Sequence, residues 1–256
     1  MTAIPPATRS LLEKTAVDNG FDREIPGEGE WVSFVSTQVP LRIWLGADSG
    51  NGLVAAVSRR NVAKALGGHG RLFADPRSLP VGAATALSVP DLPSLHRLVR
   101  RAFQLSRTLP DELLQTFRRQ TAALPASTEA ERLVVERVGQ DLFRGGLLDY
   151  WDGTCAVTGL AVPELLRASH IKPWAACATD AERLDVFNGL LLAPHLDAVF
   201  DRGLITVEDD GSVAISSLLD PGARRVLGLD APLRVRSLEE AHRAYLPWHR
   251  ERVFLR

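Results

Sequence analysis

The apolar positions of residues 31–57 follow the pattern of β-strands, after a short helix and a turn expected in residues 1–30. Three short runs rich in β-branched and aromatic residues predict strands, at residues 31–35, 41–45 and 53–57. Residues 48–52 read Asp-Ser-Gly-Asn-Gly, and the Asn-Gly pair predicts a hairpin turn between the second and third runs. A helix is predicted over residues 59–66, with Ser58 as its cap. These elements predict a small unit of mixed helix and sheet.

The period of the apolar positions changes to that of a helix near residue 95. Apolar side chains recur at spacings of three and four through residues 95–105, and a second helix is predicted at Asp111–Ala122. A third is predicted at Glu129–Arg144, because Thr128 and Glu131 form a capping box and Gly145-Gly146 follows the last apolar turn.

The stretch Leu124-Pro125-Ala126-Ser127-Thr128 is the strongest candidate for a domain boundary. It combines a proline with small residues directly before a helix start. We therefore expect an N-terminal domain over residues 1–125 and a C-terminal domain over residues 126–256.

The pattern in the C-terminal domain predicts a strand, a loop and a helix that carries acidic residues. His170 ends a short extended segment, and Asn188 precedes a run of leucines. Pro194 suits the first turn of the helix that follows. Asp197 and Asp201 lie four residues apart, so both carboxylates can face one ion from the same side of that helix.

The end of the chain is expected to hold a hairpin, a strand and a helix. Residues 204–207 and 213–215 flank Asp209-Asp210-Gly211 as a hairpin, before a strand at 233–236 and a helix at 237–246. His242 and His249 have no partner at the spacing of a metal site, and they are interpreted as surface residues.

Composition places the chain among soluble globular proteins. In 256 residues, 45% are apolar and 24% are charged, and no apolar run approaches the ~20 residues of a membrane span. Two cysteines are too few for a disulfide framework, and a cytoplasmic location is the plain expectation. The formal net charge of -1 is not typical of a nucleic-acid binder, so a DNA-binding surface would have to come from a local asymmetry of charge.

One local asymmetry is present. Residues 94–119 contain six arginines and two acidic residues, which leaves a local charge of +4. A solvated helix face explains this run as well as a phosphate-binding surface does. The arginines are Arg97, Arg100, Arg101, Arg107, Arg118 and Arg119.

Taken from the residues alone, His170, Asn188 and the aspartate pair describe a single-metal hydrolytic site. A histidine can take the proton of an attacking water, because its ordinary pKa of ~6.5 lies near working pH. A cation between Asp197 and Asp201 can neutralise charge at a phosphate. The competing interpretation is that Asp201 caps the following turn and His170 fills a niche in the core.

The order of motifs in roughly residues 128–215 resembles the HNH endonuclease family, in particular the subfamily found in restriction-type nucleases. The matching pieces are Cys155-Ala-Val-Thr-Gly159, Ala168-Ser-His-Ile-Lys-Pro-Trp174, Asn188-Gly-Leu-Leu-Leu192 and Asp197-Ala-Val-Phe-Asp-Arg-Gly203. The resemblance implies a ββα-metal finger, so the expected fold class is α+β, with a small N-terminal α+β domain followed by an HNH nuclease domain.

The resemblance also implies roles for individual residues. His170 takes the position of the general base, Asn188 the position that braces the loop, and Asp197 and Asp201 the metal-ligand positions. Ser169 stands where many relatives have an aspartate or histidine ligand, and it is a much poorer ligand. This favours Mg²⁺ or Mn²⁺ held partly by water and phosphate. Ser169 and His195 are further candidate ligands, although His195 faces away from the aspartates on a regular helix.

Candidate DNA contacts come from both domains. Lys172 and Arg202 lie within the motifs, and Arg137 and Arg144 lie on the helix before the finger, where surface exposure explains them equally well. Arg97, Arg100 and Arg101 complete the set.

Two classes of function follow. The first is a metal-dependent DNA endonuclease of restriction or defence type, with residues 1–125 as a recognition domain that reads sequence or a DNA modification. Double-strand cleavage by such an enzyme would suit a homodimer, and no membrane partner is expected. The second is a DNA-binding regulator whose degenerate HNH finger binds DNA without cutting it.

Overall fold

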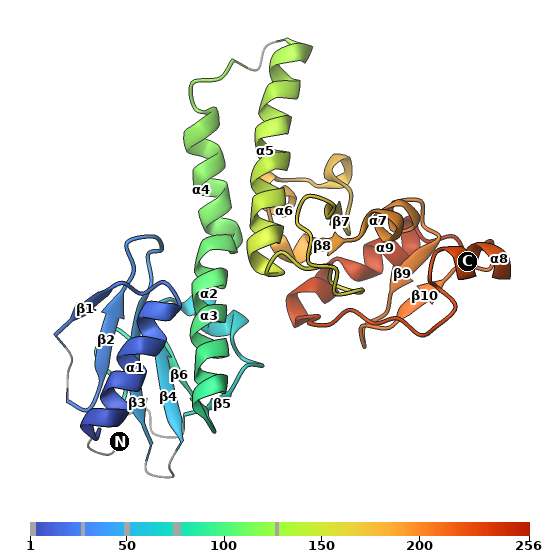
Figure 1. Cartoon of the computed structure of the whole chain (residues 1–256). Coiled ribbons are helices and arrows are strands. Elements are labelled where there is room, and N and C mark those ends of the chain that lie inside the picture. The colour runs from blue at the N-terminus through green and yellow to red at the C-terminus, as the bar shows by residue number, and fades with distance from the viewer. Residues whose placement is uncertain (1–3, 27–28, 49–51, 74–77, 126–127) are drawn as a thin grey trace. The chain divides into compact units, whose positions relative to one another are not determined.

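The computed structural model describes residues 4–26, 29–48, 52–73, 78–125 and 128–256. These residues form two compact units, Met1–Arg107 and Thr108–Arg256 (Figure 1). The chain mixes helices with antiparallel strands, as the predicted α+β class requires. Within the described ranges, none of the helices combines the length and apolar character that crossing a bilayer requires.

The first unit is built on a six-stranded antiparallel sheet with the strand order β1-β2-β3-β4-β6-β5. The strands are β1 (Arg23–Ile25), β2 (Val32–Val35), β3 (Arg42–Ala47), β4 (Leu53–Val57), β5 (Arg71–Leu72) and β6 (Thr85–Val89). The helices are α1 (Pro6–Asp18), α2 (Arg60–Ala65) and α3 (Leu92–Thr108). The three strands predicted from β-branched and aromatic runs are therefore confirmed as β2, β3 and β4.

Part of the core of the first unit lies between the sheet and α3, and a second buried cluster contains Trp31, Trp44 and Val54. Leu98, Val99 and Ala102 of α3 line a small internal space together with Ile43 and Leu87 of the sheet. All five side chains are buried, because the apolar stripe of the helix has the spacing that covers one face of a sheet.

Two local expectations in the first unit have different outcomes. The helix predicted over 59–66 is confirmed as α2, but Ser58 does not cap it. The Ser58 hydroxyl instead accepts the backbone N–H of Arg42 at 3.0 Å, which ties it to β3. Strands β3 and β4 pair antiparallel as the hairpin signal predicts, while residues 49–51 of the turn lie outside the described residues.

The second unit begins with two long helices, α4 (Pro110–Thr121) and α5 (Glu129–Tyr150). The predicted capping box of α5 is confirmed, since the Thr128 hydroxyl accepts the Glu131 N–H at 3.2 Å and Glu131 accepts the Thr128 N–H at 2.9 Å. The helix does not end at Gly145-Gly146 as expected but continues to Tyr150. A Cβ on Gly146 would lie 2.7 Å from Leu113 Cδ1, so the glycine is needed where α4 packs against α5.

The division between the units falls after Arg107, whereas the boundary expected from sequence falls between residues 125 and 126. Helix α4 therefore belongs with α5 in the second unit. Residues 126 and 127 of the expected linker lie outside the described residues.

The rest of the second unit consists of short elements. These are β7 (Arg167–His170), α6 (Asp180–Arg183), β8 (Gly189–Leu192), α7 (Pro194–Asp201), β9 (Ile205–Val207), β10 (Val213–Ile215), α8 (Pro221–Val226) and α9 (Leu246–Arg252). Strands β9 and β10 form the predicted hairpin.

The C-terminal elements differ from expectation. The strand predicted at 233–236 is reduced to one bridge, between Ser212 and Arg234. The helix predicted at 237–246 is a 3₁₀ turn over Glu240–Ala244, and a new helix, α9, begins at Leu246. Pro247 lies in the first turn of α9, where a proline is well tolerated, but it cannot continue a preceding helix.

Candidate active site

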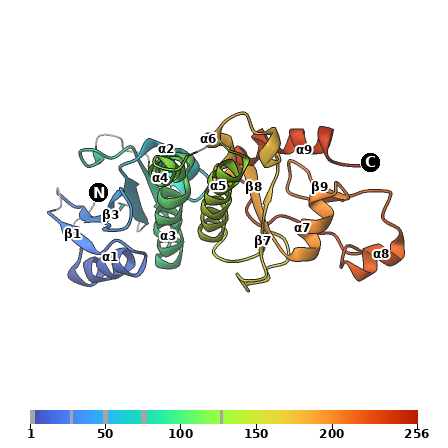
Figure 2. The same ribbon diagram turned by 90° about the horizontal axis from the view of Figure 1, so that it is seen from above.

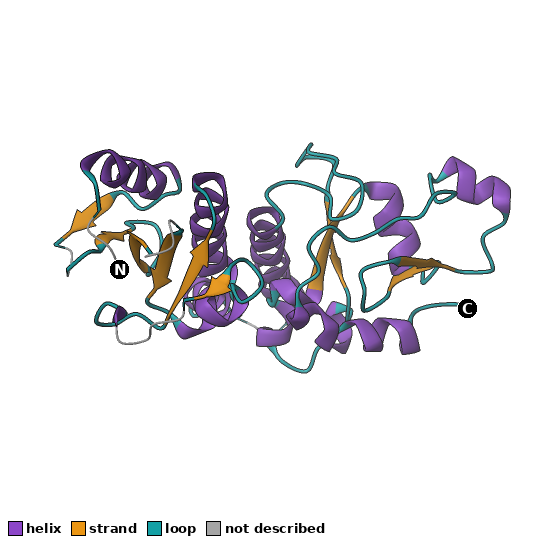
Figure 3. Ribbon diagram, turned by 90° about the horizontal axis from the view of Figure 1, so that it is seen from below, coloured by secondary structure: helices purple, strands orange, loops and turns teal. Residues whose placement is uncertain are grey.

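A ββα arrangement carries the predicted functional residues. Strands β7 and β8 pair antiparallel, with His170 opposite Gly189, and α7 packs beside β7 (Figures 2 and 3). Pro194 occupies the first turn of α7, as predicted. A Cβ on Gly189 would lie 2.9 Å from Leu147 Cδ1, so the absence of a side chain lets α5 pack directly over the strand pair.

A cleft of about 330 Å³ opens at the end of β7. It brings His170 and Ser169 of β7 together with Asp201 of α7, although these residues lie far apart in sequence. The lining is completed by Ala168, Pro173, Trp174, His249 and Val253.

The His170 ring is held on two sides. It stacks on Phe143 of α5 with ring centroids 3.7 Å apart, and its Nε2 lies 2.9 Å from the carbonyl oxygen of Arg183. Because a carbonyl can only accept, Nε2 carries the hydrogen and Nδ1 of the neutral ring keeps a lone pair. Burial lowers the pKa of His170 to about 4, against the smaller opposing effect of the Arg183 hydrogen bond.

Asn188 is fully buried and braces the loop that follows His170. Its Oδ1 accepts the backbone N–H of Lys172 at 2.8 Å, and its Nδ2 donates to the carbonyl oxygens of Lys172 and Glu182, each at 3.1 Å. The Asn188 carbonyl accepts the N–H of Ile171 at 2.9 Å. These bonds fix the backbone immediately after His170.

The two aspartates interact electrostatically. Burial and then the neighbouring charge of Asp197 raise the pKa of Asp201 to about 6. The hydroxyl of Ser169, which is buried, donates to Asp197 Oδ1. Ser169 therefore orients one of the two acidic side chains in addition to lining the cleft.

This donor set fits a hard divalent cation. Among the described residues, no group of three or more His, Cys, Asp or Glu side chains gathers at one point, so the protein offers two carboxylates and the Ser169 hydroxyl. Mg²⁺ and Mn²⁺ accept carboxylate oxygens and keep several water or phosphate ligands. The mutual repulsion of Asp197 and Asp201 is the feature that a bound cation would relieve.

His195 occupies a different position. It is exposed on the first turn of α7 and does not belong to the described residues that line the cleft.

The predicted DNA contacts are used in different ways. Lys172 forms an ion pair with Glu182 at 2.9 Å, and Arg144 donates to the carbonyl oxygens of Leu166 and Pro163. Arg137 and Arg202 are exposed. In the first unit, Arg97 and Arg100 of α3 are exposed, whereas Arg101 is only 9% exposed.

Sequence reasoning missed His249. It was expected at the surface with His242, but both histidines are buried, so that interpretation is wrong. His249 stacks on Phe200 with ring centroids 3.9 Å apart and lines the cleft. The spacing of Leu246, His249 and Val253, which share one helical face, is the signal that predicts burial.

Comparison with known proteins gives a family match over part of the second unit. A model of the HNH endonuclease family matches residues 155–208, the segment that contains β7, β8 and α7. No curated protein matches the chain. The C-terminal unit thus contains an HNH endonuclease domain, and a domain of this kind indicates a nuclease-type function that acts on DNA.

Proposed function

We propose that this protein is a metal-dependent DNA endonuclease that hydrolyses phosphodiester bonds. The observation that carries the proposal is the cleft that His170 and Asp201 share. Among the described residues, one ring nitrogen of His170 has no hydrogen-bond partner, and Ser169 donates to Asp197, the other acidic residue of the pair. These are the groups that water activation and phosphate binding require.

In the proposed reaction His170 acts as the general base. Its Nδ1 takes a proton from a water molecule as the water oxygen forms a bond to phosphorus and the bond to the leaving 3′ oxygen breaks. The leaving oxygen then takes a proton from solvent. The carbonyl of Arg183 accepts from Nε2–H throughout, which favours the charged ring that forms.

The low pKa of His170 is compatible with this role. The ring is neutral near pH 7, so its lone pair is available at the start of the reaction. The negative charge of a bound phosphodiester raises the pKa of a nearby imidazole and makes it a stronger base in the complex.

Asp197 and Asp201 would hold the divalent metal ion, Mg²⁺ or Mn²⁺. When bound, such an ion supplies positive charge that stabilises the phosphate in the transition state. Asn188 keeps the loop rigid behind His170, and Ser169 holds Asp197 in place.

The exposed arginines are the proposed contacts to the DNA backbone. Arg202 directly follows Asp201, Arg137 lies on α5, and Arg97 and Arg100 lie on α3. A first unit that recognises DNA and a second unit that cuts it would suit an enzyme of restriction or defence type, and dependence on a DNA modification belongs to the same proposal. Cleavage of both strands would then be the work of a homodimer.

A DNA-binding regulator that does not cut is the second candidate. The identity of Ser169 favours the regulator, because its hydroxyl donates to Asp197 and adds no negative charge to the metal-ligand set.

The test is plasmid nicking by the full chain with Mg²⁺, with Mn²⁺ and with EDTA, for wild type, His170→Ala and His195→Ala. We expect metal-dependent nicking that falls by about 10²–10⁴-fold in His170→Ala. His195→Ala is the matched control, because it removes an exposed histidine of the same finger, and it should cut like wild type. Cleavage at the wild-type rate by folded His170→Ala would refute the assignment. DNA binding without cutting under every metal would favour the regulator.

A further inference from the structure

The C-terminal helix is joined to the end of the helix that carries Asp201. His249 Nε2 lies 3.2 Å from the carbonyl oxygen of Phe200, the residue directly before Asp201. This carbonyl belongs to the last turn of α7 and also accepts the backbone N–H of Gly203 at 2.9 Å. His249 therefore adds a side-chain hydrogen bond at the point where Asp201 leaves the helix.

Both ring nitrogens of His249 are occupied. The Phe200 carbonyl can only accept, so Nε2 carries the hydrogen, and Nδ1 lies 2.9 Å from the buried hydroxyl of Thr206, which can donate to it. The ring is also stacked on Phe200. His170 differs, because the structure gives its Nδ1 no hydrogen bond among the described residues.

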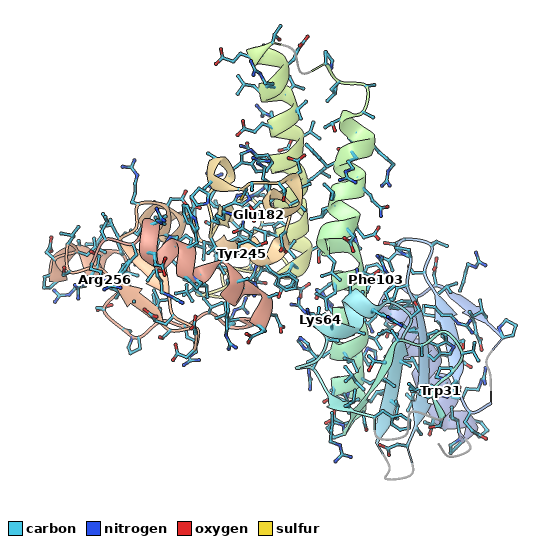
Figure 4. All side chains as sticks on the ribbon, turned by 180° about the vertical axis from the view of Figure 1, so that it is seen from behind. Trp31, Lys64, Phe103, Glu182, Tyr245 and Arg256 are labelled. Carbon is cyan, nitrogen blue, oxygen red and sulfur yellow. The ribbon has the colours of Figure 1, made fainter. Side chains whose placement is uncertain are left out.

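Further contacts hold the C-terminal segment in place. The N–H of Leu255 donates to the carbonyl of Gly203 at 2.8 Å. Gly203 has a φ of +69°, and a Cβ there would collide with the carbonyl oxygen of Val253. At the other end of α9, the Tyr245 hydroxyl donates to Asp185 Oδ2 at 2.8 Å, in the segment beyond Glu182 (Figure 4). The C-terminal segment is thus fastened at both of its ends.

We infer that His249 is a positioning residue that sets the Asp201 carboxylate for metal binding through the Phe200 carbonyl. This inference rests on the proposed metal site of Asp197 and Asp201. Residue 249 lies outside the segment that matches the HNH family. The hydrogen bond from His249 to the Phe200 carbonyl therefore comes from a part of this chain beyond the matched domain. With both nitrogens occupied, His249 acts through Asp201 and not on the substrate.

The test is calorimetric titration of Mn²⁺ into the full chain, combined with thermal unfolding in EDTA. His249→Phe keeps an aromatic ring on Phe200 but loses both hydrogen bonds, and we expect it to weaken Mn²⁺ binding by about 10-fold or more. His249→Gln offers an amide donor to Phe200 and an acceptor to Thr206, so it should recover most of the affinity. Thr206→Val removes only the Nδ1 partner and should give a smaller loss.

Two controls separate positioning from general destabilisation. His242→Phe changes a second buried histidine, which packs against Tyr150, Trp151 and Phe187, and it should lower the melting temperature without changing the Mn²⁺ affinity. In an Asp201→Asn background, His249→Phe should cause no further loss of affinity, because the group through which it acts is gone.

Several results would overturn the inference. They are wild-type Mn²⁺ affinity in folded His249→Phe, an undiminished loss in the Asp201→Asn background, or absence of Mn²⁺ binding by the wild type. If His249→Phe fails to fold, the same comparison is made with His249→Gln and Thr206→Val, and unchanged affinity in both would count against the inference. A wild type that binds Mn²⁺ with this dependence on His249 but never cuts DNA would refute the proposed function and leave the positioning role standing.

Discussion

His170 and His249 line one cleft, and their different hydrogen bonds indicate different roles. Burial lowers the pKa of both His170 and His249 to about 4, so neither pKa distinguishes them. The distinction comes from the partners, since His249 uses both ring nitrogens whereas His170 donates one and keeps a lone pair on the other. The chemistry of a histidine is decided by which nitrogen remains free.

Asp201 should make the metal-free protein sensitive to pH. The pKa of Asp201 is raised from 3.8 to about 6, so the folded protein is more stable when this carboxyl is protonated. That stabilisation is complete below about pH 4 and is lost as the pH rises through about 6. In EDTA, Asp201→Asn should therefore melt at a higher temperature than wild type at about pH 7.5, and the difference should shrink towards pH 4. Thermal unfolding monitored by circular dichroism measures this.

His170 and His249 change the stability in the opposite direction with pH, but they do so in both wild type and Asp201→Asn. Their pKa values are lowered from 6.5 to about 4, so they destabilise the fold as the pH falls through this window, equally in both proteins. Asp141→Asn, at an exposed position of α5, is the matched control and should show no such pH-dependent gain. A constant difference between Asp201→Asn and wild type at every pH would contradict the assignment.

Glycines allow the elements of the second unit to approach one another closely. At Gly146 of α5, Leu113 of α4 occupies the space that a Cβ would need, and at Gly139 the Trp174 ring does so, with Phe117 of α4 close by. Glycine inside a helix costs about 1 kcal/mol relative to alanine, and the close packing that it permits offsets this cost. Local helix propensity therefore predicts an end at Gly145-Gly146 that packing overrides.

Gly203 should be the least replaceable of the glycines near the site. Gly203→Ala combines a left-handed backbone with a collision against the Val253 carbonyl, and we expect it to cost roughly 3 kcal/mol of unfolding free energy. Gly159→Ala is the matched control, because Gly159 has a φ of +77° but nothing within 4 Å of its Cβ, and it should cost about 1 kcal/mol. Urea unfolding of both variants measures the difference. Equal losses of unfolding free energy would show that the C-terminal segment can move away from an added Cβ at little cost.

The two units differ from the division that composition suggests. A proline and small residues mark residues 124–128 as a linker, and they do connect two elements, but those elements are helices of one unit. Composition identifies a chain segment that leaves a helix, whereas a domain boundary depends on which apolar faces bury one another.

We expect residues 108–256 to fold alone and to be more stable than residues 126–256. The shorter fragment lacks α4 and would expose the surface that buried Leu113 and Phe117 cover, each worth about 1.5–3 kcal/mol. Urea unfolding of the two purified fragments, with the full chain as control, gives the comparison. Equal stability of the two fragments would place α4 outside the second unit, and an unfolded longer fragment would show that the units depend on one another.

Local patterns were sufficient for much of the structure. The β-branched runs of the first unit, the capping box at Thr128 and Glu131, and the proline that begins α7 all act within a few residues, so they can be recognised without knowledge of the fold. The order of the HNH motifs likewise locates His170 and Asn188, because each motif is a contiguous stretch of chain. The spacing of Asp197 and Asp201 places both on one side of a helix for the same reason.

Tertiary structure decided the environment of these residues. Ser169 meets Asp197 across 28 positions of sequence, and His249 meets Thr206 across 43, distances over which sequence pattern carries no pairing information. Whether a polar side chain is exposed, paired or buried depends on partners that only folding brings near. This is why Lys172 and Arg144 are engaged within the protein, and why His249 lies beside the candidate active site instead of at the surface.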